Sequence, residues 1–248
     1  SPTGLSLADG VRDLLFTLAE NPALPGGGLI LTARRPEDGG SFRATPGERI
    51  HLLRHALSVA ASVLAGRGIP LHVDLECDPD TAAPLPGTVD LAREARALGT
   101  RVLWSVHHFA SVPTDTVLRR LAQLARDQPE DQIKLAALVS DDTDLHRLLA
   151  YRAGLPRGRH VVIGMGSRGR MTRDLAGVLG NAWTYARHPA RAEPAPGVPT
   201  VTELRAEQRV HGQRSDDTWL AVVGNPVDHS RSPAWHNRSR WRANPTAL

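Results

Sequence analysis

Residues 101–138, RVLWSVHHFASVPTDTVLRRLAQLARDQPEDQIKLAAL, contain a strand, a helix and a second strand in succession. The short apolar runs at 101–106 and 132–138 predict buried strands, because strands covered on both faces carry few polar side chains. Between these runs, apolar residues recur at helical spacing at Val117, Leu118, Leu121 and Leu124. This order is the repeating unit of a parallel α/β sheet.

The same alternation extends over most of the chain. Further strands are predicted at 28–33, 71–76, 160–165 and 182–186, and further helices at 7–19, 50–60, 89–98, 145–149 and 202–210. Repeated β/α units of this kind favour a TIM-type (β/α)8 barrel, which belongs to the α/β class. The alternative is a doubly wound open sheet. Its glycine-rich phosphate turn follows an early strand, whereas the candidate turn at 164–169 follows the fifth.

Lys134 is the only lysine among the 30 Lys and Arg residues of the chain. An arginine keeps its proton near neutral pH, whereas a lysine amine becomes a nucleophile when burial or a nearby cation lowers its pKa. Because Lys134 lies within the apolar run 132–138, we predict that it forms a Schiff base with a carbonyl substrate. The alternative is that codon bias removed the other lysines and that Lys134 survived by chance.

The composition argues against several classes of function. The formal net charge is +4 and the arginines are spread along the chain among acidic residues, so no basic stripe and no nucleic acid partner are expected. The chain lacks a run of about 18 apolar residues, so no membrane partner is expected. Cys77 is the single cysteine, which favours a reducing cytoplasm. The sequence begins at Ser1 without methionine or a secretory signal, so we expect it to start inside a longer reading frame or after processing.

Reactive side chains lie at or after successive predicted strands: Arg34, His107, Lys134, Met165 and Arg173. In a β/α barrel the carboxyl ends of the strands meet at one mouth, so these side chains are expected to converge there. Histidine exchanges protons near neutral pH and arginine binds anions, which suits proton transfer beside the carbonyl of an anionic substrate. Taken singly, His107 is equally explained as a structural imidazole, and Arg34 and Arg173 as surface cations.

Six segments together resemble the type I 3-dehydroquinate dehydratases over roughly residues 1–210. They are 31–40 (LTARRPEDGG), 73–76 (VDLE), 104–109 (WSVHHF), 133–136 (IKLA), 164–173 (GMGSRGRMTR) and 183–186 (WTYA). The resemblance implies a lyase that converts 3-dehydroquinate to 3-dehydroshikimate, in the shikimate pathway of aromatic amino acid biosynthesis, without metal or cofactor. It implies that Lys134 forms the Schiff base. His107 would remove the proton beside the iminium carbon and later protonate the departing hydroxyl.

The resemblance also implies a substrate pocket and an assembly. Arg34, Asp38 and Arg173 would bind the carboxylate and hydroxyls of the substrate, and Met165 would line the pocket. A cytoplasmic homodimer is expected.

Four departures from the family pattern bear on activity. Asp38 stands where the family has Glu or Gln before the glycine pair, and His108 stands where it has Asp. Pro194 and Val198 replace the Ser and Gln of a substrate loop. The family's first two strands, with a Glu-x-Arg pair that contacts substrate, have no counterpart before Ser1. We therefore expect a barrel that lacks its first two strands.

A second resemblance begins beyond residue 210. Residues 211–217 are a predicted linker, and 219–237 (WLAVVGNPVDHSRSPAWHN) resemble the start of the shikimate dehydrogenases, so 218–248 are expected to open that domain. By this resemblance Ser230 and Ser232 would bind the shikimate carboxylate. The NADP-binding domain of that family would lie beyond Leu248, so NADP is not expected as a cofactor of this chain. The order of the two resemblances is that of a bifunctional enzyme.

Two other functions remain compatible with the sequence. The missing strands and the residues Pro194 and Val198 favour a catalytically inactive fragment of a bifunctional enzyme. A different Schiff-base lyase or aldolase on the same barrel would be expected to carry a glycine-rich phosphate loop near its last strands.

Overall fold

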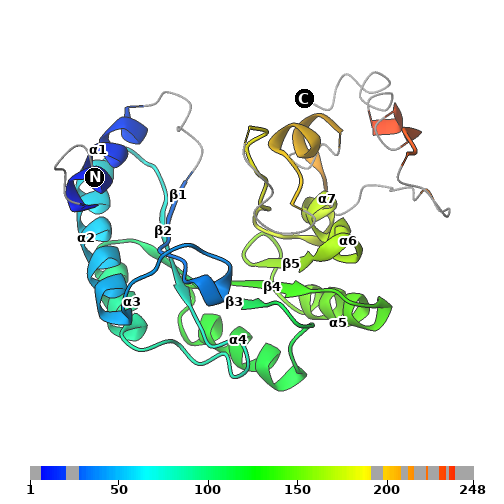
Figure 1. The fold of residues 1–248 in the computed structure, drawn as a ribbon, viewed down its shortest axis with the longest axis horizontal. Helices are drawn as coiled ribbons and strands as arrows, with labels where there is room; N and C mark the ends of the chain where they lie inside the picture. The colour runs from blue at the N-terminus through cyan, green and yellow to red at the C-terminus, as the bar shows by residue number, and fades with distance from the viewer. Residues whose placement is uncertain are drawn as a thin grey trace. The chain divides into compact units, whose positions relative to one another are not determined.

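The computed structural model describes residues 7–20, 28–190, 198–207, 212–214, 222, 229–232 and 235–237. The alternation of strands and helices from β1 to β5 confirms the predicted β/α rhythm (Figure 1). The elements follow in the order α1 Leu7–Ala19, β1 Leu29–Leu31, the 3-10 helix η1 Pro36–Asp38, α2 Pro46–Leu64, β2 Leu71–Glu76, α3 Thr88–Ala97, β3 Arg101–His108, α4 Asp115–Asp127, β4 Gln132–Leu138, α5 Asp142–Ala153, β5 Val161–Met165, α6 Gly166–Gly169, α7 Met171–Asp174, α8 Ala176–Leu179 and the π-helix η2 Glu203–Glu207.

The strands form a five-stranded sheet in the order β1-β2-β3-β4-β5. β1 pairs with β2, and β2 with β3, in parallel, with Asp74 opposite Leu103 and Glu76 opposite Ser105. A doubly wound sheet reverses its strand order at a switch point, whereas this order follows the chain throughout. The architecture is therefore a parallel α/β half-barrel, as expected for part of a TIM-type barrel, and the open-sheet alternative is wrong.

The predicted strand at 182–186 is also wrong, because this segment is irregular backbone. The amide of Ala182 does donate to the carbonyl of His160 at 2.9 Å, as a neighbouring strand would. The side chain of Asn181, however, accepts from the amide of Val162 at 2.8 Å and donates to its carbonyl at 3.0 Å. A side-chain amide thus occupies backbone groups of β5 that a sixth strand would need.

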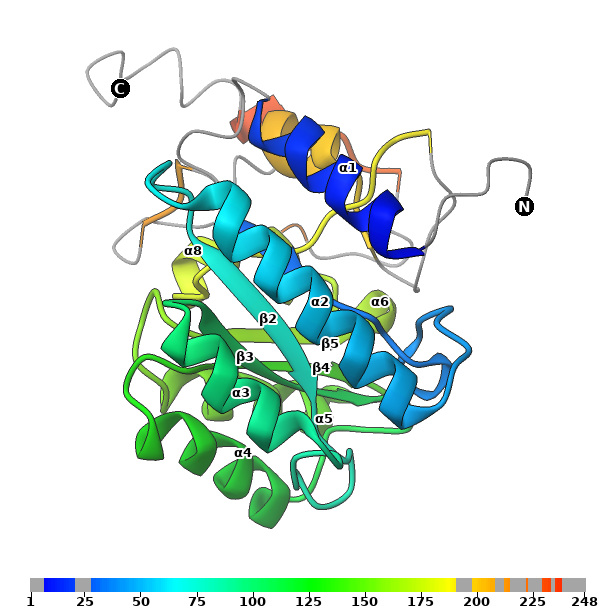
Figure 2. The same ribbon diagram turned by 90° about the vertical axis from the view of Figure 1, so that its left-hand side faces the viewer.

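The chain divides into two compact units. Unit 1 comprises Ser1–His108 and Pro113–Leu135, and unit 2 comprises Phe109–Val112 and Ala136–Leu248. In unit 1, α1 packs against α2, while α2, α3 and α4 pack against the strands β1 to β3 (Figure 2).

Helix α2 begins with a capping box, in which the Thr45 hydroxyl accepts from the Glu48 amide and the Glu48 carboxylate accepts from the Thr45 amide.

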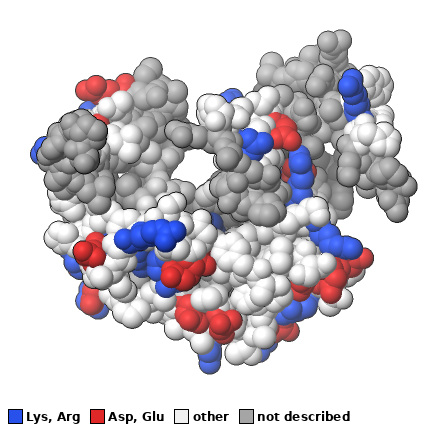
Figure 3. Space-filling view, viewed as in Figure 1, with Lys and Arg blue, Asp and Glu red and all other residues white. Residues whose placement is uncertain are grey.

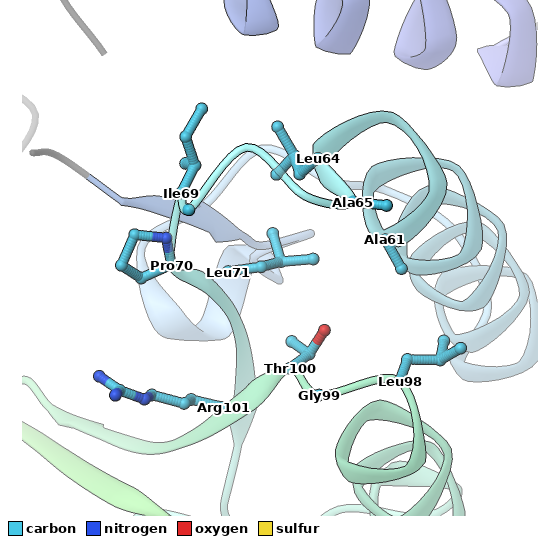
Figure 4. Close-up of a pocket in the computed structure, with 11 residues that line it drawn as sticks. Ala61, Leu64, Ala65, Ile69, Pro70, Leu71, Leu98, Gly99, Thr100 and Arg101 are labelled. Atoms are coloured by element: carbon cyan, nitrogen blue, oxygen red, sulfur yellow. The ribbon is translucent and has the colours of Figure 1, made fainter. Parts of the chain in front are cut away.

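A cavity of about 330 Å³ lies in unit 1 at the amino ends of β2 and β3. Its walls include Ala61 and Leu64 of α2, Leu71 of β2, and Leu98 and Thr100 from the turn before β3 (Figure 4). Chemistry in TIM-type barrels occurs at the carboxyl ends of the strands. This cavity therefore lies at the wrong ends of β2 and β3 to be the candidate active site.

In unit 2, the glycines of the segment 164–169 allow two stretches of backbone to touch. A Cβ atom on Gly164 would lie 2.6 Å from Gly169 Cα and 2.9 Å from a methyl group of Val139. These distances are too short for any side chain at residue 164 without a backbone shift. Close packing of β5 against α6 thus accounts for these glycines without a phosphate ligand.

We predict that Gly164→Ala lowers the free energy of unfolding by about 1–3 kcal/mol, the usual cost of overpacking a rigid interior. Gly47→Ala is the matched control, because Gly47 lies in the first turn of α2 with open space around its Cα. Alanine favours a helix over glycine, so this variant should be as stable as the parent or more so. Urea unfolding midpoints of both variants measure the difference, and equal midpoints would contradict the packing argument.

Candidate active site

Polar side chains occupy alternate positions on three neighbouring strands of unit 1. They are His72, Asp74 and Glu76 on β2, Ser105 and His107 on β3, and Gln132 and Lys134 on β4, and all are buried. Successive side chains of a strand point to opposite faces of the sheet, so each strand presents its polar set on one face. On β2 the alternate residues are Leu71, Val73 and Leu75, and Leu71 lines the cavity beside α2. The polar face is therefore the one turned away from the helices.

Asp74 lies at the centre of this polar face, with 1% of its surface exposed. Its Oδ1 accepts from Ser105 Oγ at 2.5 Å, and its Oδ2 accepts from Arg34 Nη2 at 2.5 Å. Lys134 Nζ lies 3.4 Å from the same Oδ2. Burial alone would raise the pKa of this carboxyl, but the nearby positive charges, first Lys134 and then Arg34, lower the pKa to about 2. Asp74 is therefore an anion at every pH at which the protein would be used.

Lys134 is 6% exposed, so it is not the surface lysine that chance survival would leave. Burial lowers the pKa of its amine from the ordinary 10.5, and the charge of Arg34 lowers it further. The carboxylate of Asp74 acts in the opposite direction. The amine is thus easier to deprotonate than an ordinary lysine, while it keeps a counter-ion for any positive charge that it carries.

His107 contacts Arg34, one of the residues that were predicted to lie near it. Arg34 Nη1 lies 2.8 Å from His107 Nδ1 and 2.7 Å from Nε2, so it donates to whichever ring nitrogen lacks a proton. Burial lowers the pKa of His107 well below 6.5, and the charges of Lys134 and Arg34 act in the same direction. His107 is therefore a neutral imidazole near pH 7, able to accept a proton. Arg34 is not the surface cation of the alternative interpretation. Its side chain is 17% exposed, Nη1 contacts His107, and Nη2 is paired with Asp74.

Asp38 lies on η1, and its carboxylate accepts from Arg35 Nε at 2.7 Å. Burial raises the pKa of Asp38, while its pairing with Arg35 opposes the shift. The turn that holds this pair needs both following glycines. Gly39 has a φ of 81°, and a Cβ on Gly40 would lie 2.1 Å from the carbonyl oxygen of Arg34. The departure from Glu to Asp is thus accompanied by a carboxylate that engages Arg35, and not His107.

A second buried ion pair lies next to the site, between Glu76 of β2 and Arg49 of α2. Glu76 is fully buried and accepts from the guanidinium of Arg49, a residue of α2. The amide of Arg35 also approaches Glu76 Oε1 at 3.4 Å. Burial raises the pKa of Glu76, and Arg49 opposes this shift. Glu76 therefore connects α2 to the segment that carries Arg34 and Arg35.

The family model of type I 3-dehydroquinase matches residues 5–214 of the chain. The chain belongs to the type I 3-dehydroquinase family. A 3-dehydroquinate dehydratase of Thermococcus gammatolerans is 30% identical over 180 residues, which cover 71% of this chain and 74% of that protein. The expected family resemblance is thereby confirmed for the dehydratase part.

Two further matches extend this picture. The bifunctional 3-dehydroquinate dehydratase/shikimate dehydrogenase of Arabidopsis thaliana is 25% identical over 227 residues, or 91% of this chain. The chain spans only 34% of the length of that relative. A structure of type I 3-dehydroquinate dehydratase from Clostridium difficile, 18% identical, has a TM-score of 0.63 over 82% of this chain and 75% of its own. This last match concerns the fold alone.

The two remaining candidates from the family motif, Met165 and Arg173, lie in unit 2. Met165 ends β5 and is 5% exposed. Arg173 lies on α7 and is 4% exposed, so it is not a surface cation either. Burial lowers the pKa of Arg173 to about 10, which leaves it charged near neutral pH. Its Nε is buried and has no hydrogen-bond partner among the described residues.

The residues of the second resemblance are described only in part. Ser230 Oγ lies 3.4 Å from the amide of Ser232, and Ser232 is exposed. Pro194 lies outside the described residues, as do most of the predicted linker at 211–217 and most of 218–248. Val198 is buried. As an apolar residue it supplies no side-chain hydrogen bond in place of the family's glutamine.

Asp74, Ser105 and Glu76 were not predicted as site residues, although a signal for them exists. In 71–76, LHVDLE, every second residue is polar, which predicts one polar and one aliphatic strand face. Two carboxylates on the same face of a buried strand require cations, and a search for partners would have led to Arg34, Arg49 and Lys134.

Three further observations concern the surface charge, the helices and the metal-ligating side chains of the described residues. Figure 3 shows Lys and Arg side chains interleaved with Asp and Glu on this face, without a continuous basic stripe among the residues coloured there. Within the described ranges, no helix is long and apolar enough to cross a membrane. The same ranges contain no cluster of three or more His, Cys, Asp or Glu side chains that could hold a metal ion.

The pKa of Asp74 predicts how acid affects stability. The pKa is about 2 in the folded chain against an ordinary 3.8, so Asp74 stabilises the fold fully above pH 4 and loses this contribution as pH falls toward 2. The shift corresponds to about 2 kcal/mol. Urea unfolding at a series of pH values should show this loss in the parent and not in Asp74→Asn, which has no carboxyl to titrate. The same dependence of the unfolding free energy on pH in the parent and in Asp74→Asn would show that Asp74 does not cause the loss.

Proposed function

We propose that this chain dehydrates 3-dehydroquinate to 3-dehydroshikimate through a Schiff base on Lys134. The observation that carries this proposal is the setting of Lys134. The chain's single lysine is buried on the polar face of β4, has a lowered pKa, and shares Asp74 with the Arg34 that contacts a neutral His107. Membership of the type I 3-dehydroquinase family supports the substrate assignment.

The proposed first step uses the amine of Lys134. The neutral amine attacks the ketone carbon, and the resulting carbinolamine takes up a proton and loses water to give an iminium ion. Burial favours this step because it lowers the pKa of Lys134 and so increases the fraction of neutral amine. The iminium withdraws electrons from the neighbouring C–H bond, so that a base of ordinary strength can remove its proton.

The proposed second step uses His107. Its unprotonated ring nitrogen accepts the proton beside the iminium carbon, which leaves an enamine. The imidazolium then returns a proton to the hydroxyl two carbons from the iminium carbon, and that hydroxyl leaves as water. Hydrolysis of the remaining imine regenerates Lys134, and the net change is the loss of one water molecule. Each part of this chemistry uses protein side chains, so neither a metal nor an organic cofactor enters a step.

The remaining predicted residues are proposed as substrate ligands. Arg34 and Asp38 would contact hydroxyls, and Met165 would contact the carbon skeleton. We assign the substrate carboxylate to Arg173, because it is a buried cation whose Nε has no hydrogen-bond partner among the described residues. A homodimer in the cytoplasm remains our expectation for the assembly.

We also propose that residues 218–248 open a shikimate dehydrogenase-like domain, with 1–210 as the dehydratase part and 211–217 as the linker. The match to the Arabidopsis bifunctional relative supports this, because 91% of the chain is more than residues 1–214 contain. That match therefore continues past the end of the family model at residue 214. Ser230 and Ser232 would contribute to a carboxylate site of that domain, and NADP would be required only by its remainder.

A second candidate function is a catalytically inactive fragment. The buried, apolar Val198 favours it, because this residue provides no hydrogen bond where the family pattern has a glutamine. The trapping experiment below separates the two functions.

We predict that borohydride traps substrate on Lys134 and nowhere else. The purified chain, treated with 3-dehydroquinate and borohydride, should gain one reduced adduct by intact-mass analysis. Lys134→Arg should give no adduct, because a guanidinium keeps its charge near Asp74 but does not form an imine. An adduct that persists in this variant would locate the chemistry at the N-terminal amine. No adduct in the folded parent chain would support the inactive fragment.

His107 acts after imine formation in this mechanism, which predicts a distinct product in His107→Gln. The variant should still form the imine but should lose turnover by about 10²- to 10⁴-fold, the usual contribution of a general base. Borohydride should then trap the substrate imine before dehydration, so the adduct is heavier than that of the parent by one water molecule. A dehydrated adduct formed at the parental rate would require a different base.

A further inference from the structure

We propose that Asp74 is a catalytic residue of this site, which serves as the counter-ion of the positively charged iminium on Lys134. This assignment rests on the proposed Schiff-base function and deepens it. It concerns a residue that contacts the reacting nitrogen directly, since Asp74 Oδ2 lies 3.4 Å from Lys134 Nζ.

The carboxylate is held in one orientation by groups from separate parts of unit 1. Ser105 Oγ on β3 donates to Oδ1 at 2.5 Å, and Arg34 Nη2, after β1, donates to Oδ2 at 2.5 Å. With 1% of its surface exposed, Asp74 has no room to turn toward water. A fixed charge of this kind stabilises a charge that develops beside it without reorganisation, and this is the main source of electrostatic catalysis in enclosed sites.

The balance of the first reaction step shows where this charge matters. A neutral amine and a ketone take up one proton and release one water as the iminium forms, so the site gains one positive charge. Other ionisable groups near Lys134 include Arg34, His107 and Glu76. Arg34 opposes the new cation and His107 opposes it when protonated, while Glu76 is bonded to Arg49. Asp74 is therefore the carboxylate placed to neutralise it.

Asp74 has opposite effects on two reaction steps, the attack of the amine and the removal of the proton beside the iminium carbon. It favours the protonated amine, which slows the attack, and burial offsets this by lowering the pKa of Lys134. It also favours the protonated iminium, which is the form that activates the adjacent C–H bond. We therefore expect removal of the charge to affect the population and pH range of the iminium more than the binding of substrate.

The test measures borohydride trapping against pH from about 6 to 10, between the ordinary pKa values of histidine and lysine. Asp74→Asn keeps the size of the side chain and removes its charge. We expect its trapped fraction at the alkaline end to fall about tenfold, with the midpoint of trapping displaced by about one unit to lower pH. Asp74→Glu, which restores the charge with a longer reach, should recover part of this displacement. Values of kcat should fall more than KM rises.

Asp131→Asn is the matched control for loss of a buried, ion-paired carboxylate. Asp131 accepts from Arg96 and from Trp104 Nε1 and has no role in the proposed chemistry. It should lose stability but keep the trapping midpoint of the parent. An Asp74→Asn variant that is folded by circular dichroism and traps with the parental midpoint would overturn the inference. If Asp74→Asn does not fold, Asp74→Ser decides, because it also removes the charge, and a parental midpoint with a parental kcat in that variant would equally overturn the inference. Absence of any adduct in the parent chain would instead refute the proposed function itself.

Discussion

The charged cluster around Asp74 is the constraint on which the rest of the candidate site depends. A carboxylate with 1% exposure is costly unless cations and hydrogen-bond donors compensate it. Its donors Arg34, Ser105 and Lys134 are 40, 31 and 60 residues away along the chain. They meet only when β1, β2, β3 and β4 have formed, so the protonation states of the site are a consequence of the fold. Removal of Asp74 would leave the cations Arg34 and Lys134 in the interior without the counter-ion that they share.

The two faces of the sheet in unit 1 differ in composition: one carries aliphatic side chains, and the other carries the polar side chains of the candidate site. On β2 the aliphatic residues Leu71, Val73 and Leu75 lie on the face that packs with α2 and α3, where Leu53, Leu57 and Leu91 are almost fully buried. This face supplies the apolar burial that folding requires. The opposite face carries ion pairs, which stabilise the fold little more than apolar side chains of the same volume would. A strand with strict alternation can serve both purposes, because its side chains belong to separate environments.

Much of this arrangement follows from the sequence, and the failures have local causes. The predicted bounds of β2 and β4 agree with the structure. Lys134, His107 and Arg34, which were predicted from the strand ends and the single lysine, lie in one chain of contacts with Asp74. The strand at 182–186 was predicted from its apolar run, but pairing is decided by Asn181, a residue outside that run. The bond between Asp38 and Arg35 depends on the turn of η1, which spacing alone does not reveal.

The proposed Schiff-base function accounts for a single lysine at residue 134 among so many arginines. Arg34, Arg49 and Arg173 are each largely or fully buried, and a guanidinium stays charged in such a setting. Even where burial lowers the pKa of Arg173 to about 10, the guanidinium remains protonated near neutral pH. Lys134 starts from an ordinary 10.5, which burial lowers, so the same kind of setting brings its neutral form within reach. A chain that uses arginine for permanent charge thus requires lysine where a cation must be able to lose its proton.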